Sequence, residues 1–152
     1  MDDGLDRFIK MQEKDYNKAL QEIKNGKKQT CWIWYILPIM KGLRNSKNST
    51  YYGIKDLEEA TKYLKNEYLR KNLIEMSQAI LDLGDVDITE VMGFIDDIKL
   101  KQCMTLFNIV EKNNEIDCGH IFKDVLDKYF NGENDKKTLE ILEKQNNKKY
   151  DI

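Results

Sequence analysis

The sequence has few of the residues that interrupt helices or build metal centres. Its 152 residues include one proline and one histidine, His120, with three cysteines at Cys31, Cys103 and Cys118. A single proline leaves room for long helices, and three dispersed cysteines without a CxxC pair fit free thiols in a reducing compartment. Structural zinc needs four ligands, typically in close pairs. We therefore expect neither a metal nor another cofactor.

Charge and hydropathy exclude further functional classes. The formal net charge is -2, which gives no general attraction to DNA, RNA or acidic membranes, so an anion site must be a local cluster. No apolar run approaches the ~20 residues of a membrane span, and the acidic N-terminus does not resemble a signal peptide. Phosphate-loop, dinucleotide-binding and nucleophile-elbow patterns are also missing. We expect a cytoplasmic protein that binds neither nucleic acid nor membranes.

What the sequence does contain is a series of amphipathic segments. Hydrophobic residues make up 41% and charged residues 34%, as in a soluble globular domain. Apolar residues recur at three- and four-residue steps, most clearly over residues 5–25, 67–83, 96–112 and 120–130. We predict an all-α fold, a single-domain multihelical bundle of about seven to eight helices over residues 1–143. A polar C-terminal tail over 144–152 is expected to fray.

Helix boundaries are marked by capping residues. Asp2 or Asp3 is expected to cap the first helix, and Asn25-Gly26 to end it. Asp56-Leu-Glu-Glu59 is a capping box, in which each end bonds a backbone amide of the other. Asp87 and Asp135 are predicted to start two further helices, and Asp96 to open and cap a long one.

The stretch KKQTCWIWYILPIMKGLR, residues 27–44, concentrates aromatic and basic side chains. Both tryptophans, Trp32 and Trp34, stand beside Tyr35, with Lys27 and Arg44 among the flanking cations. Burial in the core is the commoner fate of such aromatics, but rings flanked by cations also suit a planar anion. A helical turn would make Trp32 and Trp34 diverge, and a strand would place both on one side. The sequence leaves both conformations open.

A second candidate feature is the start of the helix at Asp96. Asp96 and Lys99 are separated by one helical turn, and Thr105 follows downstream. Such a pair is either an exposed ion pair, worth little stability, or the polar part of a pocket.

The chain resembles a bacterial domain-of-unknown-function family, small and all-helical, whose members are sometimes labelled calpastatin. The resemblance covers nearly the whole length and rests on motifs in a fixed order: Arg7-Phe8, Gln12, Gly26-Lys27, Trp32-x-Trp34-Tyr35-x-x-Pro38, Gly42-Leu43, Tyr52-Gly53-Ile54, Glu59-Ala60, Tyr63-Leu64, Asp96-x-x-Lys99-x-x-x-x-Met104-Thr105-Leu106-Phe107, Leu126-x-Lys128-Tyr129-Phe130-x-Gly132, Asp135 and Thr138-Leu139. The resemblance implies the fold but no established activity. Calpain inhibitors of that name are disordered and proline-rich, and this chain is neither.

Two positions depart from the family pattern. Cys31 stands where the family has a histidine, and Leu37-Pro38-Ile39 where it has Phe-Pro-Gln. A thiol is a poor substitute for a histidine that transfers protons. A binding role survives this replacement more easily than catalysis does.

We therefore expect a protein that captures an anionic, nucleotide-derived small molecule, ADP-ribose-like or a cyclic nucleotide. In a phage or bacterial setting it would sequester an immune or stress signal. No catalytic residue is assigned. The alternatives are an enzyme with Asp96 as acid or base and a protein-interaction module with an exposed tryptophan as anchor. The expected ligand-binding residues are Lys27, Cys31, Trp32, Trp34, Tyr35, Arg44, Asp96, Lys99 and Thr105.

Overall fold

The computed structural model describes residues 4–150, and within this range it has nine α-helices and no β-strand. One isolated parallel bridge joins Met40 to Ile54. The predicted all-α, single-domain fold is confirmed, with one helix more than the upper end of the predicted range. The helices are α1 (Asp6–Lys24), α2 (Ile33–Ile36), α3 (Lys47–Tyr52), α4 (Leu57–Lys65), α5 (Glu67–Leu81), α6 (Ile88–Met92), α7 (Asp96–Asn114), α8 (Ile121–Phe130) and α9 (Lys136–Tyr150).

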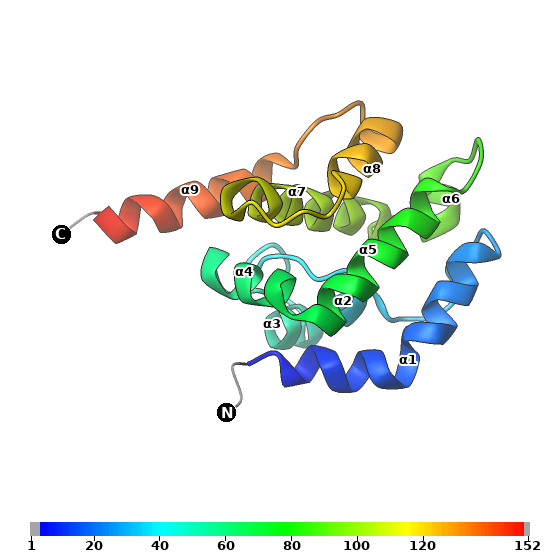
Figure 1. The fold of residues 1–152 in the computed structure, drawn as a ribbon, viewed down its shortest axis with the longest axis horizontal. Helices are drawn as coiled ribbons and strands as arrows, with labels where there is room; N and C mark the ends of the chain where they lie inside the picture. The colour runs from blue at the N-terminus through cyan, green and yellow to red at the C-terminus, as the bar shows by residue number, and fades with distance from the viewer. Residues whose placement is uncertain (1–3, 151–152) are drawn as a thin grey trace.

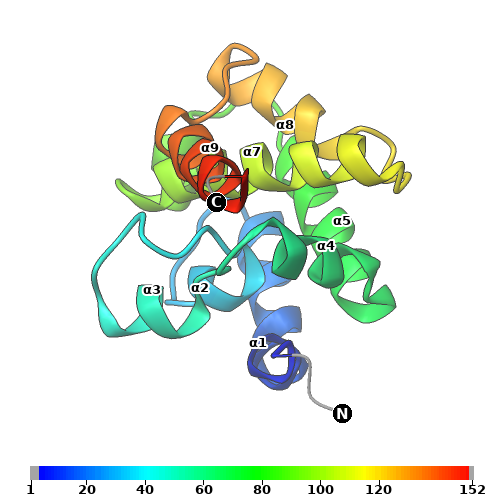
Figure 2. The same cartoon turned by 90° about the vertical axis from the view of Figure 1, so that its left-hand side faces the viewer.

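Helices α5 and α7 form the centre of the fold. In Figure 1, α5 crosses the molecule diagonally, with α1 below it and α7 and α8 above it. Helix α7 packs against α4, α6, α8 and α9, and its side chains Leu100, Met104 and Phe107 are fully buried. In Figure 2, α9 lies in front of α7. A helix that is apolar on most sides belongs in the interior, which explains the central place of α7.

The predicted helix-start signals are confirmed at three positions. Asp56, Asp87 and Asp135 each accept a hydrogen bond from a backbone amide in the helix that follows, at 2.8, 2.9 and 2.9 Å. The reciprocal half of the capping box at Asp56 is not formed. Glu59 instead accepts a hydrogen bond from a backbone amide of the preceding loop and pairs with Arg7 at 2.9 Å.

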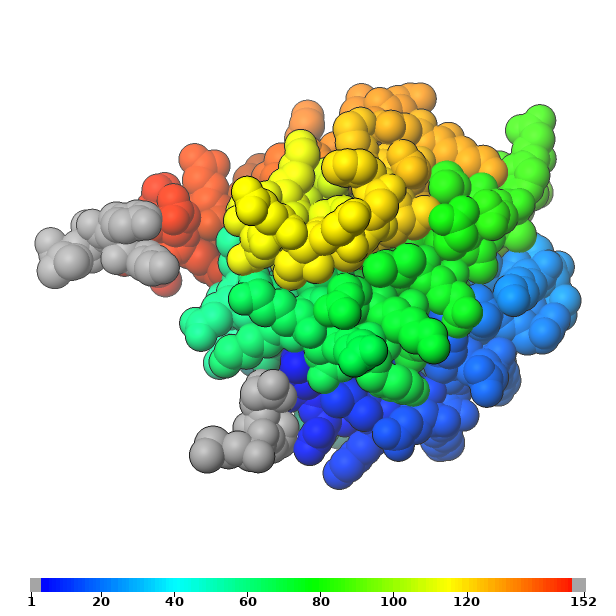
Figure 3. Space-filling model, viewed as in Figure 1, coloured from blue at the N-terminus to red at the C-terminus, as the bar shows by residue number. Residues whose placement is uncertain are grey.

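The predicted cap of the first helix and the predicted fraying of the last segment are not tested by the structure. Helix α1 has Leu5 at its N-cap, while the predicted caps Asp2 and Asp3 lie outside the described residues. The segment from Lys144, predicted to fray, continues α9 as far as Tyr150. Figure 3 shows this end of α9 projecting from one side of the molecule. A polar sequence remains helical here because it extends a helix that already has a capped start.

A buried glutamine holds the aromatic segment in place. The amide nitrogen of Gln12 donates hydrogen bonds to the Tyr35 carbonyl at 2.7 Å and to the Tyr63 hydroxyl at 2.9 Å, and its oxygen accepts one from Asn72 at 3.0 Å. Gln12 is 1% exposed, so these bonds satisfy a group that would be costly to bury alone. A single turn such as α2 is not stable by itself. Its bond to Gln12 therefore fixes it against α1.

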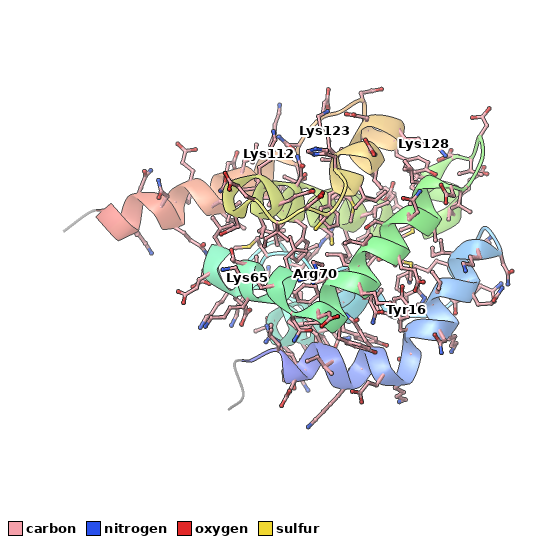
Figure 4. All side chains as sticks on the ribbon, viewed as in Figure 1. Tyr16, Lys65, Arg70, Lys112, Lys123 and Lys128 are labelled. Atoms are coloured by element: carbon pink, nitrogen blue, oxygen red, sulfur yellow. The ribbon has the colours of Figure 1, made fainter. Side chains whose placement is uncertain are left out.

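Helix α8 secures the end of α5. Lys128, labelled in Figure 4, lies beside the C-terminal end of α5 and donates to the carbonyl oxygens of Leu81 and Leu83 at 2.7 and 3.2 Å. Tyr129 donates to the Ile80 carbonyl at 2.6 Å. The last carbonyl groups of a helix need partners from outside the helix. This part of the family motif thus serves the fold.

Candidate functional site

The aromatic segment folds as one helical turn, which resolves the choice between helix and strand. Helix α2 ends at Ile36, and Leu37 has φ -125° and ψ 69°, because a residue before proline avoids the helical region. The two indoles diverge, as predicted for a helix. Trp32 is 1% exposed in the core, whereas Trp34 is only partly buried.

A buried carboxylate anchors Trp32. Glu22, at the end of α1, accepts hydrogen bonds from the Trp32 indole at 2.9 Å and from the hydroxyl of Thr30 at 2.6 Å. It also accepts the backbone amides of Gln29 and Thr30. Burial raises the pKa of Glu22, but these hydrogen bonds outweigh that effect and lower the pKa to about 2. Glu22 therefore fixes the basic turn that precedes α2.

Four side chains beside this anchor form what we call the lysine–tryptophan cluster: Lys28, Trp34, Asp96 and Lys99. The Asp96 carboxylate lies 2.8 Å from the Lys28 ammonium and 3.2 Å from that of Lys99. The Lys99 ammonium is 3.7 Å from the centre of the Trp34 ring. The lysine side chains are only 7% and 9% exposed. Two largely buried cations thus share one carboxylate, while Lys99 lies over the Trp34 ring and Lys28 lies 5.0 Å from the centre of the Trp32 ring.

Lys28 was not among the predicted ligand residues, and it replaces its neighbour Lys27 in the cluster. The Lys28 amide donates to the Val91 carbonyl at 2.8 Å and its ammonium donates to the Thr30 carbonyl at 2.6 Å, which turns the side chain inward. Lys27 is exposed. It lines a hollow of about 540 Å³ together with the acidic residues Asp85, Asp87 and Glu90. An anion would be repelled there.

The backbone that leads to Asp96 is strained. Ile95 occupies the N-cap of α7 with φ 83° and ψ -48°. A β-branched residue with positive φ costs on the order of 1–3 kcal/mol, and such residues cluster at functional sites. The predicted capping role of Asp96 is wrong, because Ile95 holds that position and both Asp96 oxygens contact lysines.

Tyr35 faces α1 instead of the cluster, and Cys31 precedes α2. The Tyr35 hydroxyl donates to Asp15 and lies 3.4 Å from the Cys31 carbonyl. Burial, followed by the Asp15 carboxylate, raises the pKa of Tyr35. Cys31 is exposed. Neither side chain joins the cluster through a described contact.

Thr105 and Arg44 also lie apart from it. The Thr105 hydroxyl donates to the Lys101 carbonyl at 2.8 Å and accepts the Asp135 amide at 2.9 Å, so it holds the start of α9. Arg44 follows Gly42 and Leu43 in the loop before α3, and its Nε is buried without a hydrogen-bond partner. Among the described residues, no hydrogen bond or ion pair connects Arg44 to the cluster.

Hollows elsewhere on the surface offer less distinctive chemistry. One of about 670 Å³ is lined by residues of α1 and α5, in which Lys24, Arg70 and Lys71 alternate with acidic side chains. Its charges balance locally, whereas those of the cluster do not. Within residues 4–150, no three His, Cys, Asp or Glu side chains are placed to hold a metal. No helix in that range is long and apolar enough to cross a membrane.

Comparison with known proteins places these motifs in a family. The conserved hypothetical protein Rv1873 from Mycobacterium tuberculosis, known from a crystal structure at 1.38 Å, has the same fold with a TM-score of 0.84 and 33% sequence identity. The alignment covers 91% of this chain and 95% of that one. No protein of curated function matches. Residues 2–142 match the family described as protein of unknown function DUF1810, and the chain belongs to that family.

Proposed function

We propose that the lysine–tryptophan cluster binds an anionic, nucleotide-derived small molecule. The observation that carries this proposal is the charge balance: Lys28 and Lys99 are both largely buried, and among residues 4–150 Asp96 is the one carboxylate in ion-pair contact with either. Glu22 is a second negative charge nearby, but it makes no ion pair with either lysine in the described structure, and four hydrogen-bond donors stabilise its charge. A buried charge is costly unless it is paired. A phosphate group would supply the missing negative charge.

Trp34 would supply the surface for the ring of the ligand. In the structure the Lys99 ammonium lies 3.7 Å from the centre of the indole ring, a cation–π contact worth about 0.5–2 kcal/mol. A phosphate would offer Lys99 a stronger, charge-assisted partner and draw it off the ring. The freed face would then stack on a base, which is worth about 1–3 kcal/mol. Binding of the phosphate and of the base would thus be coupled through Lys99.

Capture without turnover is the form of this function that the residues favour. An acid or base must have a free position toward the substrate, and both oxygens of Asp96 are engaged by lysines. Cys31, which stands in place of the family histidine, is exposed and makes no described side-chain contact with the cluster. Such a protein would sequester its ligand, for example an immune or stress signal.

A protein-interaction module is the second candidate, through Phe94 instead of a tryptophan. Trp32 is buried and the Trp34 ring lies under Lys99, so neither is an exposed anchor. Phe94, in the strained turn before α7, is 79% exposed, and Ile98 beside it is 37% exposed. A single exposed aromatic makes a smaller anchor than a clustered apolar patch, which ranks this candidate second.

The proposal is tested by a thermal-shift panel of ADP-ribose, AMP, NAD and cyclic AMP on the wild type and on Lys99→Met. A ligand at a hundred times its Kd should add roughly 2.7 kcal/mol to the free energy of unfolding. The Lys99→Met variant should lose most of that shift. Lys101→Met is the matched control, because Lys101 also lies on α7 near an aromatic ring, Phe130 at 5.9 Å, but outside the cluster.

Two results would contradict the proposal. One is that no ligand of the panel changes the melting temperature of the wild type. The other is that a ligand raises the melting temperatures of wild type and Lys99→Met equally. Recovery of the bound compound separates capture from turnover. Unchanged ligand supports sequestration, and a converted ligand would make the protein an enzyme.

A further inference from the structure

Gln102 carries a buried carboxamide that has no partner in the fold. The residue is 3% exposed, and its side-chain oxygen is completely buried without a hydrogen bond. Its amide nitrogen likewise makes no hydrogen bond to the described residues. Leaving such a group unpaired destabilises the fold, and native proteins satisfy nearly all buried polar groups. The Gln102 amide is therefore left for a partner outside residues 4–150, either a buried water or a bound ligand.

The position of Gln102 connects it with the lysine–tryptophan cluster. It follows Lys99 by three residues on α7, so the two side chains are neighbours on one face, with about 5–6 Å between their Cβ atoms. Side chains of a helix tilt toward its N-terminus. The Gln102 amide thus leans back toward the turn that carries Lys99, whose ammonium lies over the Trp34 ring.

The carboxamide presents an acceptor and a donor side by side. This arrangement complements the edge of adenine, which offers the N6 amino group as donor and N7 as acceptor, and glutamine forms this bidentate pair in other recognition sites. The oxygen is the more deeply buried of the two unpaired atoms, so a ligand must bring a donor to it. An adenine base stacked on Trp34 would do so while its phosphates meet the lysines.

We propose that Gln102 recognises the amino-bearing edge of an adenine base, which makes the ligand of the cluster an adenine nucleotide. This inference rests on the proposed function and adds the identity of the base and the residue that reads it. Lys28 and Lys99 then select for phosphate, Trp34 selects for a flat ring, and Gln102 selects among the bases. A base with a carbonyl group at the same position would leave the Gln102 oxygen facing another acceptor.

Isothermal titration with AMP and with purine riboside 5′-monophosphate tests this assignment, because the two compounds differ only in the 6-amino group. The wild type is expected to bind AMP about tenfold more tightly, or better, since one bidentate base contact is worth about 1–3 kcal/mol. Gln102→Leu should bind the two compounds equally and unfold at the same or a higher temperature, because it removes an unpaired buried amide. Lys99→Met should weaken both compounds by the same factor.

The outcomes separate this inference from the proposed function. Equal binding of AMP and purine riboside 5′-monophosphate by the wild type overturns the role of Gln102 but keeps the anion site. Tighter binding of GMP than of AMP would also overturn the role of Gln102 and keep the anion site. So would an AMP preference that persists in Gln102→Leu. In either case a buried water satisfies the Gln102 amide. If the wild type binds none of AMP, ribose 5-phosphate and inorganic phosphate, the anion site itself is refuted.

Discussion

Replacing Asp96 by asparagine is expected to lower the free energy of unfolding by about 3 kcal/mol. The variant keeps the shape of the side chain but leaves the ammonium groups of Lys28 and Lys99 without a negative partner. Breaking a buried ion pair typically costs about 3–5 kcal/mol. The lower end applies here, because the Asp96 side chain is 20% exposed and water screens part of the charge. Urea denaturation at neutral pH and low ionic strength measures the change.

Asp97→Asn is the matched control for this experiment. Asp97 is the next residue of α7 and accepts hydrogen bonds from the Thr89 hydroxyl at 2.7 Å and from the Ile98 amide at 2.8 Å, but it has no ion pair in the described structure. Its replacement should cost about 1 kcal/mol, as for a lost hydrogen bond. Added ADP-ribose should restore stability to Asp96→Asn more than to Asp97→Asn. Equal urea midpoints for the two variants would show that Asp96 does not compensate the lysines.

Replacing Glu22 by glutamine is expected to remove a pH-dependent part of the stability, on the order of 3 kcal/mol at neutral pH. The pKa of Glu22 falls from its ordinary value of 4.5 to about 2 in the folded protein. A lowered pKa stabilises the fold above the unfolded-state value, and this stabilisation is lost as the pH falls from about 4.5 to 2. The difference in the free energy of unfolding between wild type and Glu22→Gln should therefore reach its full size at pH 6 and shrink toward zero at pH 2.

Urea midpoints measured between pH 2 and pH 7 test this prediction. Glu13→Gln serves as the control, because Glu13 lies on the same helix α1 but is exposed. That variant should follow the wild type across the whole range to within about 0.5 kcal/mol. A constant difference between wild type and Glu22→Gln at every pH would mean that the hydrogen bonds to Glu22, and not its charge, hold the basic turn.

The helical fold could be predicted because its signals are local. Caps such as Asp56 and Asp135 lie within three residues of the amides they bind, and the apolar period of α7 is read directly from its sequence. The persistence of α9 to Tyr150 could not be predicted this way. It depends on the rest of the helix, since helical structure propagates more easily than it begins.

The candidate site could be predicted only in part. Trp34, Asp96 and Lys99 were singled out from their spacing, and the structure brings them together. Lys27 and Lys28 are adjacent in the sequence, and only the turn anchored by Glu22 decides which of them faces inward. Glu22 itself looks like an ordinary surface residue of an amphipathic helix.

The backbone at Ile95 and the role of Thr105 show a second limit of prediction from the sequence. The positive φ of Ile95 has no sequence signal, because a β-branched residue is the last one expected there. Thr105 stood in a matched motif with Asp96 and Lys99 and so suggested a shared site. It follows Asp96 by nine residues, however, which at 3.6 residues per turn places it on the side of α7 opposite Asp96. It binds the start of α9 there.

The central claim is that Trp34 and its two lysines receive an anionic ligand while Trp32 serves the core. The chain has two tryptophans, so a ¹⁵N-labelled sample should show two indole N–H resonances, which a Trp34→Phe variant assigns. Titration with ADP-ribose is predicted to shift the Trp34 resonance strongly, because Lys99 leaves its ring. The Trp32 resonance should move less, because the Lys28 ammonium lies farther from its ring, at 5.0 Å, and Glu22 holds its N–H. Two unmoved resonances at millimolar ADP-ribose, or a shift confined to Trp32, would contradict the account.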